Sequence, residues 1–170
     1  MIVQLDGTTF ASHVPALAEV LVDAVDSGAS VGFLAPLDQD DAAGWWRAWG
    51  ESVAAGSTLT WVARDASGIA GTVSVVLAAK ANARHRAELV KLMVLRRARG
   101  AGLARRLLAT AEAAAVHKGV SLLLLDTETA SAADRLYQAT GWTRYGIVPD
   151  YAADPGGTLR DCSFYYKELA

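Results

Sequence analysis

One short stretch of the sequence combines glycines and arginines in a way that suits binding of an anion. It reads Arg97-Ala98-Arg99-Gly100-Ala101-Gly102 and lies between an apolar run and an amphipathic segment. A turn from a strand into a helix directs several backbone N–H groups and the positive end of the helix dipole to one place. Glycine at 100 and 102 lets the backbone approach an anion without an intervening Cβ atom. The pattern predicts a phosphate-binding loop, and its alternative is a tight turn with solvated arginines.

Two common phosphate-binding motifs do not fit this stretch. A dinucleotide fingerprint requires a third glycine where Arg105 stands, and the pattern G-x4-G-K-[ST] occurs nowhere in the chain. The remaining pattern resembles the R/Q-x-x-G-x-G/A signature of the GNAT family of N-acetyltransferases. A second stretch, from Ala132 to Trp142, resembles that family's motif A-x-x-L-Y-x-x-x-G-F. The two motifs stand in the family's order, and the resemblance covers nearly the whole chain.

Four shorter stretches resemble the tabtoxin-resistance acetyltransferases within this family. They are residues 28–33, 91–95, 98–100 and 125–128. The resemblance implies a small amine as acceptor, such as a toxin or an antibiotic. One departure from the wider family is Arg96, which stands where a proline often follows the strand.

The family resemblance also implies the cosubstrate and the residues that hold it. Acetyl-CoA would bind with its pyrophosphate on the glycine loop, and no metal would be required. A strand that separates from its neighbour would leave backbone N–H groups free for the thioester carbonyl and the pantetheine amides. The residues expected to bind acetyl-CoA are Met93, Val94, Leu95, Arg97, Arg99, Gly100, Ala101, Gly102 and Leu103.

Two carboxylates are candidates for removing a proton from the acceptor amine. An ammonium group with a pKa of about 10.4 leaves about one molecule in 2500 as free nucleophile at pH 7, so a base is useful. Glu88 and Asp126 lie on the two strands that should flank the gap, and the resemblance implies that such carboxylates act through water. The alternatives are that Glu88 pairs with Arg84 or Arg86, and that Asp126 caps the next turn.

Tyr137 is the candidate acid. The family motif places this tyrosine beside the departing thiolate, to which its phenol could give a proton. The alternative is a packing tyrosine. For the acceptor we expect contacts from Ser30, Phe33 and Trp46, although Trp45, Trp46 and Trp49 at helical spacing are also typical of a core.

The elements that must position these residues follow from hydrophobic periodicity and turn residues. The order is β α α β β β α β α β β, a mixed and mostly antiparallel α/β sheet of about seven strands with a central splay and about four helices. The expected strands are 2–5, 58–64, 69–77, 88–95, 121–125, 143–148 and 159–169, and the expected helices are 12–28, 38–56, 102–117 and 131–140.

Composition narrows the class of protein. The 170 residues predict a single domain, 1–170, and 52 % hydrophobic residues exclude a disordered chain. Sixteen basic and eighteen acidic residues give a net charge of −2, which argues against a nucleic-acid or membrane partner. The single cysteine and the lack of a signal sequence fit the cytoplasm.

Several functions and assemblies remain open from the sequence. The first interpretation is an N-acetyltransferase that acts on the primary amine of a small molecule through a ternary complex. The alternatives are a protein N-terminal or lysine acetyltransferase and, in another class, a non-catalytic acyl-CoA-binding module. A homodimer is compatible with the sequence, which does not identify the amine.

Overall fold

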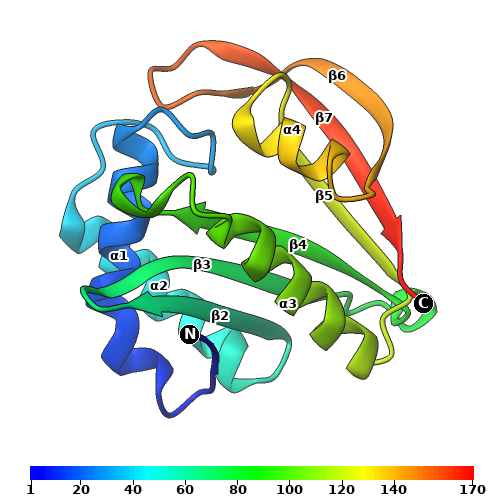
Figure 1. The fold of residues 1–170 in the computed structure, drawn as a ribbon, viewed down its shortest axis with the longest axis horizontal. Helices are drawn as coiled ribbons and strands as arrows, with labels where there is room; N and C mark the ends of the chain where they lie inside the picture. Colours follow the sequence, from blue (N-terminus) through cyan, green and yellow to red (C-terminus); the bar gives the residue numbers. More distant parts are fainter.

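A seven-stranded sheet forms the centre of the computed structural model, which describes all 170 residues (Figure 1). The strand order is β1-β2-β3-β4-β5-β7-β6, and every neighbouring pair is antiparallel except β4 and β5. The mixed, mostly antiparallel sheet predicted from the sequence is therefore confirmed. The strands are β1 (Ile2–Leu5), β2 (Thr58–Asp65), β3 (Gly68–Leu77), β4 (Arg86–Val94), β5 (Leu122–Glu128), β6 (Thr143–Ala153) and β7 (Leu159–Glu168).

Four α-helices cover the two faces of the sheet. One face carries α1 and α2, which pack against each other and against β2, β3 and β4. The other face carries α3 over β2, β3 and β4 and α4 over β5 (Figure 1). The helices are α1 (Phe10–Asp26), α2 (Gln39–Ala54), α3 (Leu103–His117) and α4 (Ala132–Gln138). Two short 3-10 turns, η1 (Ala81–Ala83) and η2 (Arg96–Ala98), were not expected from the sequence.

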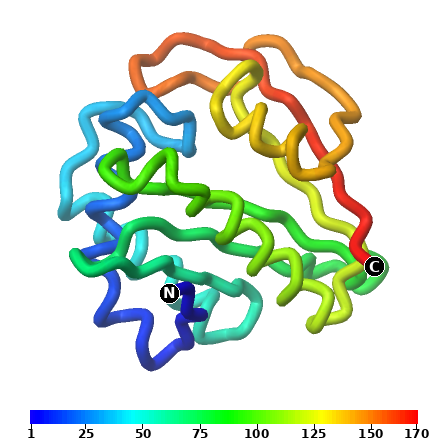
Figure 2. The backbone as a smooth tube through the Cα atoms, in the orientation of Figure 1, coloured from blue at the N-terminus to red at the C-terminus, as the bar shows by residue number.

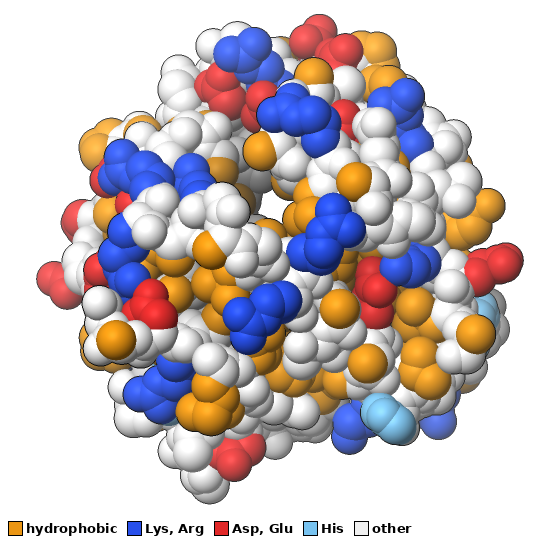
Figure 3. Space-filling view, in the orientation of Figure 1, with side chains coloured by type: hydrophobic (Ala, Val, Ile, Leu, Met, Phe, Trp, Pro, Cys, Tyr) orange, Lys and Arg blue, Asp and Glu red, His pale blue; other side chains and the backbone are white.

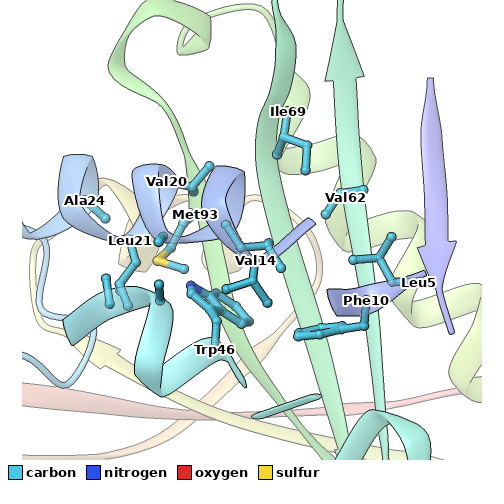
Figure 4. Packing of buried hydrophobic residues seen from close by; sticks show 14 of the residues in the cluster. Leu5, Phe10, Val14, Val20, Leu21, Ala24, Trp46, Val62, Ile69 and Met93 are labelled. Atoms are coloured by element: carbon cyan, nitrogen blue, oxygen red, sulfur yellow. The ribbon is translucent and has the colours of Figure 1, made fainter. Parts of the chain in front are cut away.

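The first two helices form for reasons that are visible in the sequence. The apolar stripe of α1 is buried, and the carboxylate of Asp38 caps α2 by accepting a hydrogen bond from the backbone N–H of Asp41 at 2.8 Å. From α2 the side chain of Trp46 enters the core between the helices and the sheet, near Met93 and Val14 (Figure 4). These contacts fix α1 and α2 on one half of the sheet.

The central pair of strands separates after a short contact. β4 and β5 run parallel and pair over only three positions, from Arg86 opposite Leu122 to Glu88 opposite Leu124. Beyond Glu88, β4 continues to Val94 along β3 while β5 continues to Glu128 along β7. The facing edges therefore carry backbone N–H and C=O groups without a strand partner.

A β-bulge lies in β4 just past the last paired position. Val90 is opposite Ser74, and Met93 is opposite Thr72, so β4 has one more residue than β3 across this interval. Within the bulge, Lys91 adopts a left-handed conformation with φ of 55°. The bulge turns β4 away from β5 and redirects the side chains that follow.

No helix combines the length and the apolar character needed to cross a membrane.

We predict that Gly71 on β3 is required for the close approach of β3 to the bulged part of β4. A Cβ at position 71 would lie 2.7 Å from the backbone oxygen of Met93, so the strands would have to move apart. Gly71→Ala should lower the free energy of unfolding by roughly 1–3 kcal/mol, the usual cost of overpacking. Urea denaturation measures this change.

The matched control is Gly146→Ala on β6, where an added Cβ has no neighbour within 4 Å. That substitution should leave stability unchanged or slightly raised, because alanine restricts the unfolded chain more than glycine does. Equal stability of the two variants would contradict the packing argument.

Candidate active site

The glycine loop has the geometry of an anion cradle. Gly100 and Gly102 have positive φ values of 81° and 73°, and Gly102 is the N-cap of α3 without any side-chain cap. The backbone N–H groups of Gly100, Ala101 and Gly102 donate no hydrogen bond within the protein. A Cβ at either glycine would meet nothing within 4 Å, so the space in front of the loop is open. Free amides and a helix N-terminus therefore face one open region.

The arginines of this loop are engaged by the protein itself. Arg97 forms an ion pair with Asp65, and Arg99 donates to the backbone oxygen of Val94 and to the Ser27 hydroxyl, at 2.9 and 2.8 Å. Arg96, in the position where the family often has proline, pairs with Asp23 on α1 at 2.7 Å. These contacts tie the loop to the β2–β3 turn and to α1. Direct contact of Arg97 or Arg99 with a phosphate stays a prediction, and the amides are the unused donors.

The signature fits the sequence a second time, two residues further on. Arg99-Gly100-Ala101-Gly102-Leu103-Ala104 also has the form R-x-x-G-x-A. In this frame the central glycine is the N-cap, and Leu103 and Ala104 lie in the first turn of α3, where N–H groups have no partner within the helix.

Glu88 and Asp126 lie on the same face of the sheet at the point where β4 and β5 separate. Glu88 is opposite Leu124, and Asp126 lies two residues further along β5, so the pleat directs both carboxylates to one side. Neither forms an ion pair, so the pairing of Glu88 with Arg84 or Arg86 does not occur. The helix that follows is capped by Ser131, and Asp126 does not cap it.

The surroundings make both carboxylates weaker acids. Although their side chains reach solvent, burial by neighbouring atoms raises the pKa of Glu88, and the charge of Asp126 raises it further. Burial likewise raises the pKa of Asp126, while the charge of Lys91 lowers it. A carboxylate with a raised pKa is a stronger base than usual, which suits proton removal.

Lys91 completes this charged cluster and was missed by the sequence analysis. Its ammonium donates to the backbone oxygen of Val31 at 2.8 Å and lies 5.6 and 5.1 Å from the ring centroids of Phe33 and Trp45. Burial lowers the pKa of Lys91, and the charges of Asp126 and Glu88 oppose that shift. The signal in the sequence was a cation inside the apolar run from Leu89 to Val94.

Tyr137 has a buried ring and an unengaged hydroxyl group. On α4 its ring packs against Trp142 and Tyr165, at centroid distances of 5.7 and 6.0 Å. The hydroxyl makes no hydrogen bond within the protein and is not among the enclosed unpaired polar atoms, so it reaches the surface. Burial raises the pKa of the phenol, and the charge of Asp126 adds to the shift, which keeps Tyr137 protonated.

The buried carboxylate of Asp134 holds α4 in place and was also missed. It accepts hydrogen bonds from the Tyr165 hydroxyl on β7 and from the backbone N–H of Ala130, the latter at 2.8 Å. Asp134 therefore anchors the helix that carries Tyr137 and has no free face for a ligand.

The residues expected to contact the acceptor lie in two different environments. Phe33 and Ser30 are half-buried in the α1–α2 loop, and Phe33 meets Trp45 edge to face at 5.4 Å. Trp46, in contrast, is 0 % exposed inside the core, so the expectation that it lines an acceptor pocket is corrected. Adjacent helical residues point about 100° apart, and the residue turned toward the site is Trp45.

Two distant loops meet beside the split between β4 and β5. The backbone N–H of Ala35, in the α1–α2 loop, donates to the oxygen of Pro155 in the β6–β7 turn at 2.8 Å. Figure 2 shows the blue loop and the orange-red turn side by side. Figure 3 shows a hollow between the N-terminal part of α3 and α4, with Lys and Arg side chains on both sides. At the split, the two carboxylates lie on one face of the sheet and Tyr137 packs with the residues of the other face, close enough for the charge of Asp126 to act on its phenol.

Comparisons with known proteins bear on the family and on the fold. The family model described as an acetyltransferase (GNAT) domain matches residues 56–144, just over half of the chain. A ribosomal-protein-alanine N-acetyltransferase from Brucella melitensis is 24% identical, with a TM-score of 0.81 and 99% of each chain covered. An N-acetyltransferase from Staphylococcus aureus Mu50 is 20% identical, with a TM-score of 0.81 and coverage of 100% of this chain and 98% of that one.

A third similar structure was determined with a ligand. The GNAT superfamily phosphinothricin acetyltransferase from Sinorhizobium meliloti, in complex with acetyl-CoA, is 18% identical, with a TM-score of 0.80 and coverage of 99% of this chain and 89% of that one. At these identities the likenesses establish the fold.

We predict that the charge of Lys91 keeps both site carboxylates more acidic than burial alone would leave them. Because a nearby cation favours the ionised form, Lys91→Met should raise the pKa of Asp126 and of Glu88. Carbon-detected NMR titration of the side-chain carboxyls measures both values. Lys118→Met, at the end of α3, is the control and should move neither, since Lys118 contributes to neither pKa. Unchanged titration of both carboxyls in Lys91→Met would refute the coupling.

Proposed function

Because the chain belongs to the GNAT family of acetyltransferases, we propose that it transfers an acetyl group from acetyl-CoA to the primary amine of a small molecule. Transfer would be direct, within a ternary complex. The observation that carries the proposal is the split between β4 and β5, where Glu88, Asp126 and Tyr137 approach one region from three elements.

The glycine loop fits the pyrophosphate of acetyl-CoA. The free amides of Gly100, Ala101 and Gly102 and the first turn of α3 can donate to phosphate oxygens, with open space in front of them. The open edge of β4 at Val94 can hydrogen-bond the pantetheine amides or stabilise the oxyanion through its N–H group. The N–H of Leu95 is not free for this role, because it donates to the backbone oxygen of Ala70 at 2.9 Å. Bound acetyl-CoA supplies the acetyl group as a thioester. The similar phosphinothricin acetyltransferase, which has acetyl-CoA bound, supports this assignment.

The protons can move through the three side chains. Glu88 takes the proton of the incoming ammonium, directly or through one water, and Asp126 holds that water or orients the amine. The amine nitrogen bonds to the acetyl carbon, and the carbon–sulfur bond breaks as Tyr137 gives its proton to the departing sulfur. The nitrogen then loses its second proton, which returns Tyr137 to the phenol through solvent, and Glu88 releases its proton to solvent. The raised pKa of Glu88 and the protonated state of Tyr137 suit these roles.

A small acceptor suits the bounded shape of the site. The hydrogen bond between Ala35 and Pro155 closes the region on one side, where a long peptide would need an open groove. The resemblance of residues 28–33 and 91–95 to tabtoxin-resistance enzymes supports a toxin-like or antibiotic-like amine.

The test is release of CoA from acetyl-CoA with a panel of small amines and of peptides with free N-termini or lysines. We expect turnover of small amines, and turnover of peptides alone would overturn the proposed acceptor class.

Tyr137→Phe keeps the packing ring and removes the hydroxyl proton, so kcat should fall by about 10²–10⁴-fold. Calorimetry should show unchanged acetyl-CoA affinity in that variant. Turnover equal to the wild type in a chemistry-limited assay would leave Tyr137 a packing residue.

Glu88→Gln should give a rate defect that depends on pH. Glu88 acts as a base only when ionised, so the wild-type rate should rise as pH passes its raised pKa. The defect should be largest between that pKa and the pKa of the amine, about 10.4, and should shrink at higher pH, where free amine is abundant. A pH–rate profile of both proteins measures it. An equal defect from pH of about 6 to 10 would assign Glu88 a structural role.

A further inference from the structure

We propose that a cavity of about 500 Å³ beside α2 holds an apolar group of the acceptor, so that the preferred substrate is a primary amine on a short arm from an aromatic or branched aliphatic group. The cavity lies between the C-terminal half of α2, the start of β2 and the end of β3. Trp45, Trp49, Val76 and Leu77 contribute most of its apolar wall. This inference rests on the proposed acetylation of a small amine.

The register of the sheet connects the cavity to Glu88. Thr58 on β2 is opposite Val76 on β3, and Val76 is opposite Glu88 on β4. Residues directly opposite each other on adjacent strands share a face and lie side by side. Two cavity residues and the candidate base therefore form one row across the sheet, with Val76 as the immediate neighbour of Glu88.

Trp45 provides a second connection. Its ring lines the cavity and also lies 5.1 Å from the ammonium of Lys91, in the cluster with Glu88 and Asp126. One wall is therefore shared by the cavity and the charged site. An amine at the carboxylates would have its substituent directed along this wall.

The lining selects an uncharged occupant. No Lys, Arg, His, Asp or Glu lines the cavity. Two of its hydroxyl groups already donate to backbone oxygens: Ser52 to Trp49 at 2.7 Å and Ser57 to Ser52 at 3.1 Å. A charged group would find no counter-ion in this open depression, whereas an apolar group would gain from the part of its surface that contacts the lining.

The aromatic wall is held rigidly before any ligand arrives. Trp45 and Trp49 stack at 4.8 Å with an interplanar angle of 25°, and the Trp49 indole N–H donates to the Thr60 hydroxyl at 3.3 Å. Rigid aromatic surfaces bind an apolar group at little cost in side-chain entropy.

The experiment compares 2-phenylethylamine with ethylamine, which present the same primary amine with and without an aromatic group. For the wild type, kcat/KM should favour 2-phenylethylamine by about 10- to 100-fold, the effect of burying one ring. Ala48→Trp and Ala79→Trp fill the cavity from opposite walls, at exposed positions where a larger side chain need not disturb the core. Each should reduce the preference to near unity.

The matched control is Ala55→Trp, which adds the same side chain at the exposed C-cap of α2 outside the cavity and should keep the wild-type preference. Thermal melting and acetyl-CoA affinity verify that all variants are folded. Equal kcat/KM for the two amines in the wild type, or an unchanged preference in both filled variants, would overturn the inference while leaving amine acetylation intact.

If the wild type acetylates neither amine, calorimetry of 2-phenylethylamine separates the two proposals. Binding that Ala48→Trp abolishes would support the pocket and count against the proposed function. No binding to the wild type would overturn the pocket.

Discussion

The early end of the pairing between β4 and β5 is the constraint on which the site depends. Three paired positions hold the two halves of the sheet together, and beyond Glu88 each strand follows a different neighbour. A continuous sheet would satisfy its backbone groups internally and leave no edge for a ligand. The separation exposes such an edge in the interior of the molecule, and it brings Glu88 and Asp126 to opposite sides of one opening.

The charged groups around this opening divide into those that hold the structure and those that remain free. Arg96, Arg97 and Arg99 are engaged by Asp23, Asp65 and Ser27, so that the glycine loop is fixed while its amides stay unused. Lys91 instead stays beside the two carboxylates and limits the rise of their pKa. Exposed ion pairs contribute little stability individually, so the role of the loop arginines is mainly to fix the direction of the amides.

The sequence predicted the order of elements and most of their ends, because hydrophobic periodicity and capping residues are local signals. The apolar stripe of α1, the cap at Asp38 and the turn at Gly102 are examples. The bulge at Lys91, the arginine–aspartate pairs and the burial of Trp46 in place of Trp45 were not predicted. Each depends on partners more than 15 residues away or on which side of a helix meets the sheet, and one sequence does not contain that information.

The width of the opening is set by contacts far from it. At one end β4 and β5 are paired, and at the other the backbone of Ala35 is tied to Pro155. Between them, Glu112 on α3 accepts hydrogen bonds from the Trp142 indole and from Lys167 on β7, at 2.9 and 2.8 Å. These ties join the half of the sheet that carries Glu88 to the half that carries Asp126 and Tyr137. Because the two halves share few strand hydrogen bonds, the relative positions of base and acid are governed by such ties, and residues distant from the chemistry control its geometry.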